Sequence, residues 1–589
     1  MSEPRSWLRR ERRTQLTIVG HSPPDAGTSR RLRSTPDPSG RPPVLELLAH
    51  ELVLRHAATR RDRAAIVAGD RAITYGELAH RIAAIATGLQ GRGVRKGDRV
   101  VVLIPMSPEL YLVLLAIAAI GATAVFVEPK STLSEIARAV RIARPRAFVA
   151  IPRAHALRAA FRDVGRVPLA VLVGPRLLAR AAGAVALEDL EIEHDGAALP
   201  PVPMTADDPV LLTFSSGSTG APKAATRSHA FLAAQHAAIE RLVDRRSWRR
   251  SGRRSGRDPG RDDVDMSAFA IVVLSSLCAG VTAVLPPLGR GGVDDVDGAA
   301  LVRVIDERGV SVLSGSPAFL APIFDAARGR HLFGVRRVVS GGAPVPVAMC
   351  EAADEVLLPK GRFLVAYGST EAEPIATIEA SEVRSDTAAA TRAGRGLCVG
   401  RPDPEIRLRL LAPAGGPLAI GPEGIDGLSV RDGEVGEVTV AGPHVNQTYY
   451  RNPAAVRATK VVDETGTVWH RTGDAGYLDG DGRLWIVGRI ADTVRRGDRD
   501  YYPAAVEALA QELPGVERAA LVADRAGGAR LVVQAARGAR GARDSRRIAD
   551  HLAAAGVPVD AVAFARALPV DPRHRAKLDY RSIREEHSA

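Results

Sequence analysis

The sequence has few cysteines, and none of them is placed to form a zinc site or a disulfide framework. Cys278, Cys350 and Cys398 are the three cysteines among 589 residues, they lie far apart, and no C-x-x-C pair occurs. Structural zinc sites and disulfide-rich folds need clustered cysteines, so both classes are excluded. The N-terminus also lacks the apolar stretch of a secretory signal. We therefore expect a reducing compartment and a cytoplasmic location.

Uninterrupted apolar runs of membrane-spanning length are also missing. Residues 110–127 and 268–289 come nearest, but Gly121 divides the first into a helical pattern and the strand-like "TAVFVEP", and the second ends in a short strand and a proline turn. Roughly 20 consecutive apolar residues are needed to cross a bilayer as a helix. Both segments instead predict a buried helix followed by a buried strand, and no integral membrane span is expected.

Acidic residues are scarce in two segments, which account for nearly all of the excess positive charge. Residues 1–43 hold nine arginines against four acids, and residues 245–261 hold eight against one. They contribute +5 and +7 to the net charge of +13, which leaves +1 for the rest of the chain. Neither segment has apolar periodicity, and each has a single tryptophan rather than aromatic residues interleaved along the run of arginines. We predict a disordered basic tail and a solvated basic loop insertion, and no nucleic-acid partner.

Apolar residues are plentiful, and their pattern predicts an α/β protein. With 46% hydrophobic residues the chain can bury a large core. From residue 44 onward, helical patterns alternate with short runs such as "RVVVLIP" and "VRRVVSGGAP", which is typical of mostly parallel sheets. After about residue 489 the pattern changes to that of a smaller α+β unit. We predict a large N-terminal domain over residues 44–488 and a small, mobile C-terminal domain over residues 489–589.

A loop rich in glycine and hydroxyl groups follows the buried-strand pattern "VLLTF". It ends in a lysine and supplies backbone N–H groups, hydroxyls and one positive charge, a combination that suits a polyphosphate. Its spacing differs from that of the P-loop, because the lysine follows Ala-Pro and no hydroxyl residue comes after it. Alone, the stretch also fits a Gly/Ser surface turn. The candidate phosphate-binding residues are Ser215, Ser216, Gly217, Ser218, Thr219, Gly220 and Lys223.

Four further motifs follow this loop in a definite order. They are "SGGAP" at 340–344, "AYGSTEAEP" at 366–374, "HRTGDAGYLDGDGRLWIVGRIAD" at 470–492 and "LPVDPRHRAKLDY" at 568–580. Together with the loop at 215–223 they resemble the signatures of the adenylate-forming superfamily, which includes acyl-CoA synthetases, luciferases and peptide-synthetase adenylation domains. Each motif is modest alone, but five in order argue strongly against coincidence. The resemblance implies activation of a carboxylic acid with ATP and Mg²⁺.

The resemblance also assigns roles to individual residues. Glu371 would hold Mg²⁺, Thr370 would contact phosphate, and Lys577 would bridge the acyl carboxylate and the α-phosphate, while Lys223 neutralises the polyphosphate. Fixed cations of this kind stabilise charge that develops during phosphoryl-type transfer. Tyr367 would stack on adenine, and Asp474 would accept hydrogen bonds from the ribose. The nucleotide-binding set implied by the motifs is Gly341, Gly342, Ala343, Tyr367, Gly368, Ser369, Asp474 and Arg489.

Structural roles remain as alternatives for these residues taken singly. Asp474 fits a turn in "TGDAG", Tyr367 fits a core aromatic residue, and Lys577 fits a solvated lysine. The chain also departs from the family pattern at two positions. Ala491 stands where the family often has Asp or Lys as the pivot between domains, and Ala576 stands where it often has Gly before the catalytic lysine. Neither departure removes a charged catalytic group.

Within the superfamily, five stretches are most similar to the olefin β-lactone synthetases. They are residues 148–158, 263–286, 367–378, 395–411 and 568–583. Those enzymes adenylate a 3-hydroxy fatty acid, and the hydroxyl of the acid then displaces AMP to close a four-membered lactone. Such an intramolecular attack needs a pocket that folds the chain, but no thiol cosubstrate.

Two residues of predicted buried segments are candidates for orienting or deprotonating the substrate hydroxyl. Two other functions also remain open. His229 and Asp265 come from segments that border the acyl pocket in relatives, although a structural role fits each of them as well. A fatty acyl-CoA or acyl-AMP ligase, with CoA as the acceptor, is the alternative enzyme. A non-catalytic adenylate-binding homologue is the alternative of another class. Beyond a fatty-acid-type substrate, the expected partners are enzymes of the same lipid pathway.

Overall fold

The computed structural model describes most of the chain from residue 48 onward. The predicted tail, most of the basic insertion, Gly217, Ser218, Thr219, Gly220 and Lys577 lie outside the described residues. The described ranges are 48–127, 131–199, 201–216, 222–245, 263–289, 292, 295–497, 499–536, 538, 544–570 and 578–587.

The first sheet has seven strands, and all neighbouring strands are parallel except the last pair. Its order is β7 (Val185–Ala186), β6 (Leu169–Leu172), β5 (Ala147–Ala150), β3 (Arg99–Leu103), β4 (Thr123–Phe126), β8 (Pro209–Ser216) and β9 (Pro222–Ser228). The helices of this part are α1 (Ala49–Thr59), α2 (Tyr75–Gly91), α3 (Pro108–Ala119), α4 (Leu133–Ala143), α5 (Pro152–Ala160), α6 (Arg162–Gly165), α7 (Arg176–Ala181) and α8 (Leu187–Glu193).

The apolar stretch at 110–127 folds as the sequence predicts. Helix α3 is buried along most of its length and strand β4 follows it. Gly121 adopts a φ of +67° between them, a left-handed conformation that costs glycine less than any other residue. No helix of the described part of the chain is both long and apolar enough to cross a membrane.

The second sheet joins a parallel half to an antiparallel half. The parallel half runs from β1 (Ala64–Ala68) through β11 (Thr282–Val284), β10 (Val264–Ser267), β12 (Val312–Gly315) and β13 (Arg337–Gly341) to β14 (Arg362–Ser369), with β2 (Arg71–Thr74) antiparallel at the edge. The antiparallel half continues through β15 (Ala372–Glu379), β16 (Leu397–Pro402), β21 (Leu484–Arg489), β20 (Val468–Leu478), β18 (Gly436–Ala441) and β17 (Arg407–Leu411), with β19 (Lys460–Val462) on β20.

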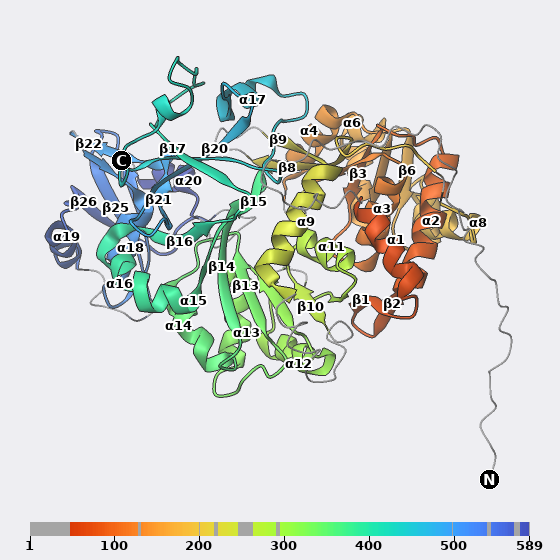
Figure 1. Ribbon diagram of the computed structural model, residues 1–589, viewed down its shortest axis with the longest axis horizontal. Coiled ribbons are helices and arrows are strands. Elements are labelled where there is room, and N and C mark those ends of the chain that lie inside the picture. The colour runs from red at the N-terminus through yellow and green to blue at the C-terminus, as the bar shows by residue number, and fades with distance from the viewer. Residues whose placement is uncertain are drawn as a thin grey trace, which may run out of the picture.

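Helices cover the second sheet and separate it from the first. Helix α9 (His229–Val243) and helix α11 (Ala270–Cys278) lie in the middle of the molecule, between the two sheets (Figure 1). The other helices of this region are α12 (Gly298–Arg308), α13 (Pro317–Ala326), α14 (Val347–Val356), α15 (Ala380–Glu382), α16 (Ala388–Ala390) and α17 (Pro453–Thr459), with the π-helical segments η1 (Val383–Thr387) and η2 (Thr391–Arg395) and the 3-10 helix η3 (Asp426–Leu428).

A small α+β unit follows strand β21 and lies at the left of Figure 1. Its main sheet has the order β24 (Val516–Ala523), β25 (Ala529–Ala535), β26 (Ala561–Ala565), and its other elements are η4 (Ile490–Asp492), β22 (Val494–Arg496), β23 (Arg499–Tyr501), α18 (Pro503–Gln511), α19 (Ser545–Ala554) and α20 (Tyr580–His587). The predicted fold class, a large α/β part with mostly parallel sheets and a small α+β part, is confirmed. The exact domain boundaries stay a prediction.

The structure corrects the sequence-based interpretation at Arg245. This residue was expected to begin a solvated basic loop, but its side chain is 2% exposed. Its guanidinium donates to both oxygens of Asp265, at 2.9 and 2.5 Å, and its Nε donates to Glu240 at 3.0 Å. Composition alone could not reveal a buried partner on a distant strand. The remainder of the insertion, residues 246–261, lies outside the described residues.

We expect Arg245→Ala to lower the free energy of unfolding by about 3–5 kcal/mol, because it leaves the buried Asp265 carboxylate without its cation. Arg141→Ala is the matched control. Arg141 pairs with Asp163 at 2.7 Å at the surface, where its side chain is 69% exposed, and such pairs contribute about 0–1 kcal/mol. Denaturant unfolding of both variants checks the prediction, and equal losses would contradict it.

A buried carboxyl group makes the stability of the small C-terminal unit depend on pH. Glu507 accepts hydrogen bonds from the Tyr580 hydroxyl at 2.6 Å and the Leu521 amide at 3.0 Å. Burial raises the pKa of Glu507 from 4.5 to about 7. Between these two values the folded state keeps a proton that the unfolded state has lost, so stability falls as pH rises through this window.

We expect Glu507→Gln to remove this loss, because an amide oxygen can accept the same two hydrogen bonds without ionising. The free energy of unfolding of the unmodified protein should fall by roughly 2–3 kcal/mol between about pH 5 and about pH 8 through this group, since each pH unit of pKa difference is worth about 1.4 kcal/mol. Thermal unfolding of both proteins at the two pH values measures the difference. An identical pH dependence in the variant would contradict the assignment.

Candidate active site

Strands β8 and β9 bring the two ends of the predicted phosphate-binding loop together. Ser215 pairs with Lys223 across this antiparallel hairpin, and Ser216 pairs with Pro222. Strand β8 is also parallel to β4, so the loop leaves the sheet at the carboxyl end of a parallel strand. In open α/β sheets, ligands bind beyond such ends.

Lys223 and Glu371 both lie next to a tyrosine that the sequence analysis did not single out. The Tyr449 hydroxyl donates to Glu371 Oε1 at 3.1 Å, and Lys223 Nζ lies 5.8 Å from the centre of the Tyr449 ring. Burial lowers the pKa of the Lys223 ammonium, and Glu371 opposes that shift. The lysine at the end of the loop is therefore buried, with 7% of its surface exposed.

A second lysine contacts the same tyrosine. Lys460 Nζ lies 5.1 Å from the Tyr449 ring centre and donates to the backbone oxygen of Asn446. Burial lowers the pKa of Lys460 to about 7, with Glu371 acting in the opposite direction. Sequence analysis missed both Tyr449 and Lys460, since neither stands in a motif with a spacing that signals chemistry.

The turn that carries Thr370 and Glu371 is held between strands β14 and β15. Ser369 pairs with Ala372 across the turn, and the backbone N–H of Asn446 donates to the backbone oxygen of Glu371 at 2.6 Å. Arg227, another residue that sequence analysis missed, donates to the backbone oxygen of Thr370 at 2.6 Å. The backbone of this turn is therefore anchored from two sides.

Tyr367, Asp474 and Arg489 form one hydrogen-bonded cluster. Tyr367 donates its hydroxyl to Asp474 Oδ2 at 2.6 Å, and Arg489 Nε lies 3.0 Å from Asp474 Oδ1. Asp474 and Arg489 are opposite each other on β20 and β21. Burial raises the pKa of Tyr367 well above its ordinary value, and the Asp474 carboxylate raises that of Arg489. The three residues that the motifs assign to adenine and ribose thus meet in space.

Strand β13 delivers the "SGGAP" turn next to this cluster. Gly341 pairs with Ala366 of β14, one residue before Tyr367. A Cβ atom on Gly341 would lie 2.7 Å from the Ala366 carbonyl oxygen, and Gly342 has a φ of +77°. Both glycines are therefore required by the local backbone. Ala343 follows them at the exit of the turn and is half-buried.

Buried hydroxyl groups near these turns have spare hydrogen-bonding capacity. Within the described residues, the side-chain oxygens of Ser340 and Ser369 are buried without a hydrogen-bond partner. A buried hydroxyl without a partner is costly, so it suits a site that receives polar ligand atoms. Ser369 lies two residues from the Glu371 carboxylate, a ligand type that Mg²⁺ prefers. The donor set at this turn therefore fits a magnesium–polyphosphate group.

The two candidates for orienting or deprotonating a substrate hydroxyl have different surroundings in the structure. His229 begins α9, and its ring centre lies 6.1 Å from that of His50. Burial lowers the pKa of His229 to about 4, so the ring is neutral near pH 7. Asp265 is fully engaged by Arg245 and by the Ser276 hydroxyl at 2.6 Å. Asp265 therefore has a structural role.

The fold and this arrangement of residues define an adenylate-forming enzyme. The chain belongs to the AMP-binding enzyme family, whose model matches residues 53–450, and the predicted superfamily is confirmed. It is accordingly an AMP-forming ligase.

Among characterised relatives, the chain is similar to an olefin β-lactone synthetase of Stenotrophomonas maltophilia, with 34% identity over 87% of this chain and 91% of the relative. A feruloyl-CoA synthase of an Amycolatopsis species is 30% identical over 80% of this chain and 84% of the relative. The fold is shared with ATP-bound MatB from Rhodopseudomonas palustris, with a TM-score of 0.73, 22% identity, and coverage of 92% of this chain and 99% of that one.

Proposed function

We propose that this enzyme uses ATP to adenylate a 3-hydroxy fatty acid and then closes the acyl adenylate to a β-lactone with release of AMP. The observation that carries the proposal is the 34% identity to an olefin β-lactone synthetase over 87% of the chain. Two groups of residues support the adenylation half of the reaction: Lys223 and Glu371 around Tyr449, and the cluster of Asp474 and Arg489 with Tyr367.

In the first half-reaction the acid's carboxylate attacks the α-phosphorus of ATP and pyrophosphate leaves. The loop at 215–223 binds the β- and γ-phosphates, with Lys223 as its fixed cation. Thr370 contacts phosphate, and Glu371 holds Mg²⁺. Bound Mg²⁺ supplies neutralising charge to the phosphate oxygens. Lys577, which lies outside the described residues, bridges the acyl carboxylate and the α-phosphate.

The nucleoside is held by the cluster on β14, β20 and β21. Asp474 accepts hydrogen bonds from the ribose hydroxyls, and Arg489 steadies the ribose or the phosphate. Both Asp474 oxygens have protein partners in the structure, so ribose binding has to share or replace them. The proposed nucleotide-binding backbone comes from the turns at 340–343 and 367–369.

In the second half-reaction the 3-hydroxyl oxygen bonds to the acyl carbon, the bond from that carbon to the phosphate oxygen breaks, and AMP leaves. The hydroxyl proton needs an acceptor. His229 is the proposed acceptor, because burial keeps its imidazole neutral and its Nδ1 has no hydrogen-bond partner within the described residues. Holding the hydroxyl near the activated carbonyl replaces a bimolecular encounter.

An acyl-CoA ligase is the second candidate, and the similarity to a feruloyl-CoA synthase favours it. In that reaction an external thiol takes the place of the 3-hydroxyl. The two candidates share the adenylation half-reaction and differ only in the nucleophile. A fatty-acid-type substrate, other enzymes of the same lipid pathway as partners, and a cytoplasmic location belong to the same proposal.

Release of AMP from matched acids tests the nucleophile. With ATP and Mg²⁺ but no CoA, a 3-hydroxy fatty acid should support repeated turnover, whereas the same acid without the hydroxyl should stop after about one equivalent of bound adenylate. Continued AMP release from both acids at equal rates would contradict the lactone proposal, since it would show that the hydroxyl takes no part.

A further inference from the structure

The elements that carry the proposed phosphate and magnesium ligands belong to different sheets. Lys223 lies on β9, the last strand of the first sheet, whereas Thr370 and Glu371 form the turn between β14 and β15 of the second sheet. A polyphosphate with its Mg²⁺ contacts both elements at once only where their spacing suits it. The residues that join the two sheets at this point therefore control the geometry of the site.

One segment, residues 445–450, pairs with both sheets. It forms an antiparallel bridge to β15 near one end and to β9 near the other. Asn446 of this segment is 1% exposed and contacts both sides. Its backbone N–H donates to the Glu371 backbone oxygen at 2.6 Å, and its Nδ2 donates to the Thr226 backbone oxygen at 2.7 Å. The main chain at Glu371 is thereby tied to β9.

Arg227 ties the neighbouring residue of the turn to the same strand. It lies on β9, four positions after Lys223, so both side chains leave the same face of the strand. Its Nη2 donates to the Thr370 backbone oxygen at 2.6 Å. Arg227 is 3% exposed, so water competes little for this contact. A side chain of the strand that carries Lys223 thus holds the turn directly.

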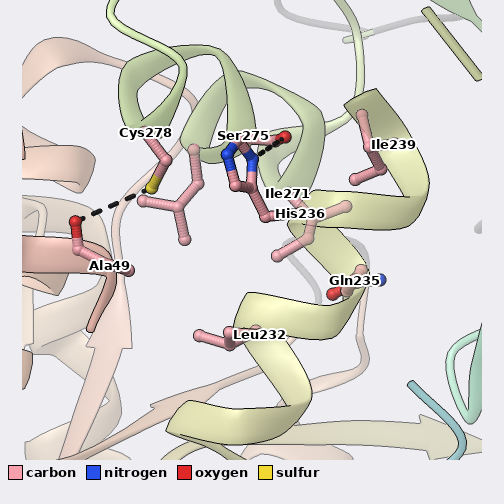
Figure 2. A pocket seen from close by; sticks show the side chains of 9 residues that line it. Ala49, Leu232, Gln235, His236, Ile239, Ile271, Ser275 and Cys278 are labelled. Carbon is pink, nitrogen blue, oxygen red and sulfur yellow. Dashed lines mark hydrogen bonds between the residues drawn. The ribbon is translucent and has the colours of Figure 1, made fainter. Parts of the chain in front are cut away.

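The Arg227 guanidinium is itself held by neighbouring side chains. Its Nη1 donates to Gln235 Oε1 at 3.4 Å, and its Nη2 lies 3.7 Å from Glu373 Oε2. Gln235 Nε2 in turn donates to Glu373 Oε2 at 3.0 Å. The space that Gln235 lines between α1, α9 and α11 measures about 20 Å³, room for about one water molecule (Figure 2). Close packing therefore restricts the partners of this buried cation, as a well-placed buried charge requires.

We propose that Arg227 is a positioning residue that fixes the Thr370–Glu371 turn against β9, and so sets the distance between the magnesium carboxylate and Lys223. The inference rests on the proposed roles of Glu371 and Lys223 in binding Mg²⁺ and the polyphosphate. Arg227 acts through the backbone of Thr370 and not by contact with ATP. Without this contact the Thr370 carbonyl can move away from β9, and the Glu371 carboxylate next to it is placed less precisely.

The test measures ATP–pyrophosphate exchange with a 3-hydroxy fatty acid over a range of Mg²⁺ concentrations in Arg227→Met and Arg227→Lys. In Arg227→Met, kcat should fall by about ten- to a hundredfold, the scale of small misplacements near a reacting centre. The Mg²⁺ concentration for half-maximal rate should rise several-fold. KM for the acid should stay within about twofold, because the acid is not assigned to this turn. Arg227→Lys keeps the charge and a donor and should lie between Arg227→Met and the unmodified enzyme in kcat and Mg²⁺ requirement.

Arg337→Met is the matched control. Arg337 is also 3% exposed, its Nε donates to the Val243 backbone oxygen at 3.1 Å, and its Nη2 lies 3.4 Å from Asp244. It begins β13, at the opposite end of that strand from the nucleotide turn. Arg337→Met therefore removes a comparable buried cation and should leave the Mg²⁺ requirement unchanged.

Thermal unfolding of each variant shows whether it is folded, and Arg227→Lys carries the test if Arg227→Met does not fold. An unchanged Mg²⁺ requirement in the folded Arg227 variants, or an equal rise in Arg337→Met, would overturn the positioning role alone. If the unmodified enzyme exchanges no pyrophosphate with any fatty acid, the proposed function fails, and this inference fails with it.

Discussion

Lys577→Ala should lower the rate of acyl-adenylate formation by roughly two to three powers of ten, the scale observed when one group that stabilises developing charge is removed. The lysine is assigned to the half-reaction in which the carboxylate meets the α-phosphate, where negative charge is most concentrated. ATP binding should survive, because the groups assigned to the nucleoside and the outer phosphates are elsewhere in the chain. ATP–pyrophosphate exchange, with ATP affinity measured in parallel, checks both parts.

Arg575→Ala provides a control for Lys577, since it removes a positive charge two residues away without removing the group assigned to the reaction. It should leave pyrophosphate exchange within a few-fold. Exchange at the unmodified rate in Lys577→Ala would contradict the assignment, as would an equal loss in both variants.

Glu371→Gln should reduce pyrophosphate exchange by about two to three powers of ten, because it replaces the proposed magnesium-binding carboxylate with a neutral amide. The Mg²⁺ concentration for half-maximal rate should also rise. The substitution also removes the negative charge that raises the pKa of Lys223 and Lys460 against the lowering effect of burial. Both lysines near the polyphosphate therefore lose their proton more easily. Exchange assays over a range of Mg²⁺ concentrations measure both effects.

Tyr449→Phe is the matched control for Glu371. It removes the hydroxyl that donates to Glu371 Oε1 at 3.1 Å and keeps both the carboxylate and the aromatic ring beside the two lysines. We expect a loss of no more than about tenfold, the scale of one hydrogen bond, with little change in the Mg²⁺ requirement. If the tyrosine variant matched Glu371→Gln in both measurements, the carboxylate would not be acting through a metal.

The parts of the site that sequence analysis predicted are those carried by short motifs. Tyr367, Asp474 and Arg489 were assigned to one ligand, and in the structure Tyr367 and Arg489 contact opposite oxygens of the Asp474 carboxylate. The predicted alternation of helices and strands likewise became a mostly parallel first sheet, a second sheet with a parallel half, and a separate small sheet. Motifs and hydrophobic periodicity involve residues that are close in sequence, so they can be recognised without knowledge of long-range contacts.

The parts that sequence analysis missed depend on contacts between distant segments. Arg227 bonds to Thr370 across 143 positions in the chain, and Lys460 reaches the site through Tyr449. Arg245 was grouped with a solvated basic run because its sequence neighbours are arginines, yet its partner Asp265 lies on a buried strand. In each case the residue's role depends on its partner in the folded chain, which composition and spacing do not encode.

In the proposed reaction the activated acyl group is captured by the substrate's own hydroxyl. Product analysis by mass spectrometry tests this capture, with a racemic 3-hydroxy fatty acid, ATP and Mg²⁺, in the presence and absence of CoA. We predict a product lighter than the acid by one water, formed with AMP at a rate that CoA does not change. A thioester that forms only with CoA, accompanied by faster AMP release, would contradict the claim and identify an acyl-CoA ligase.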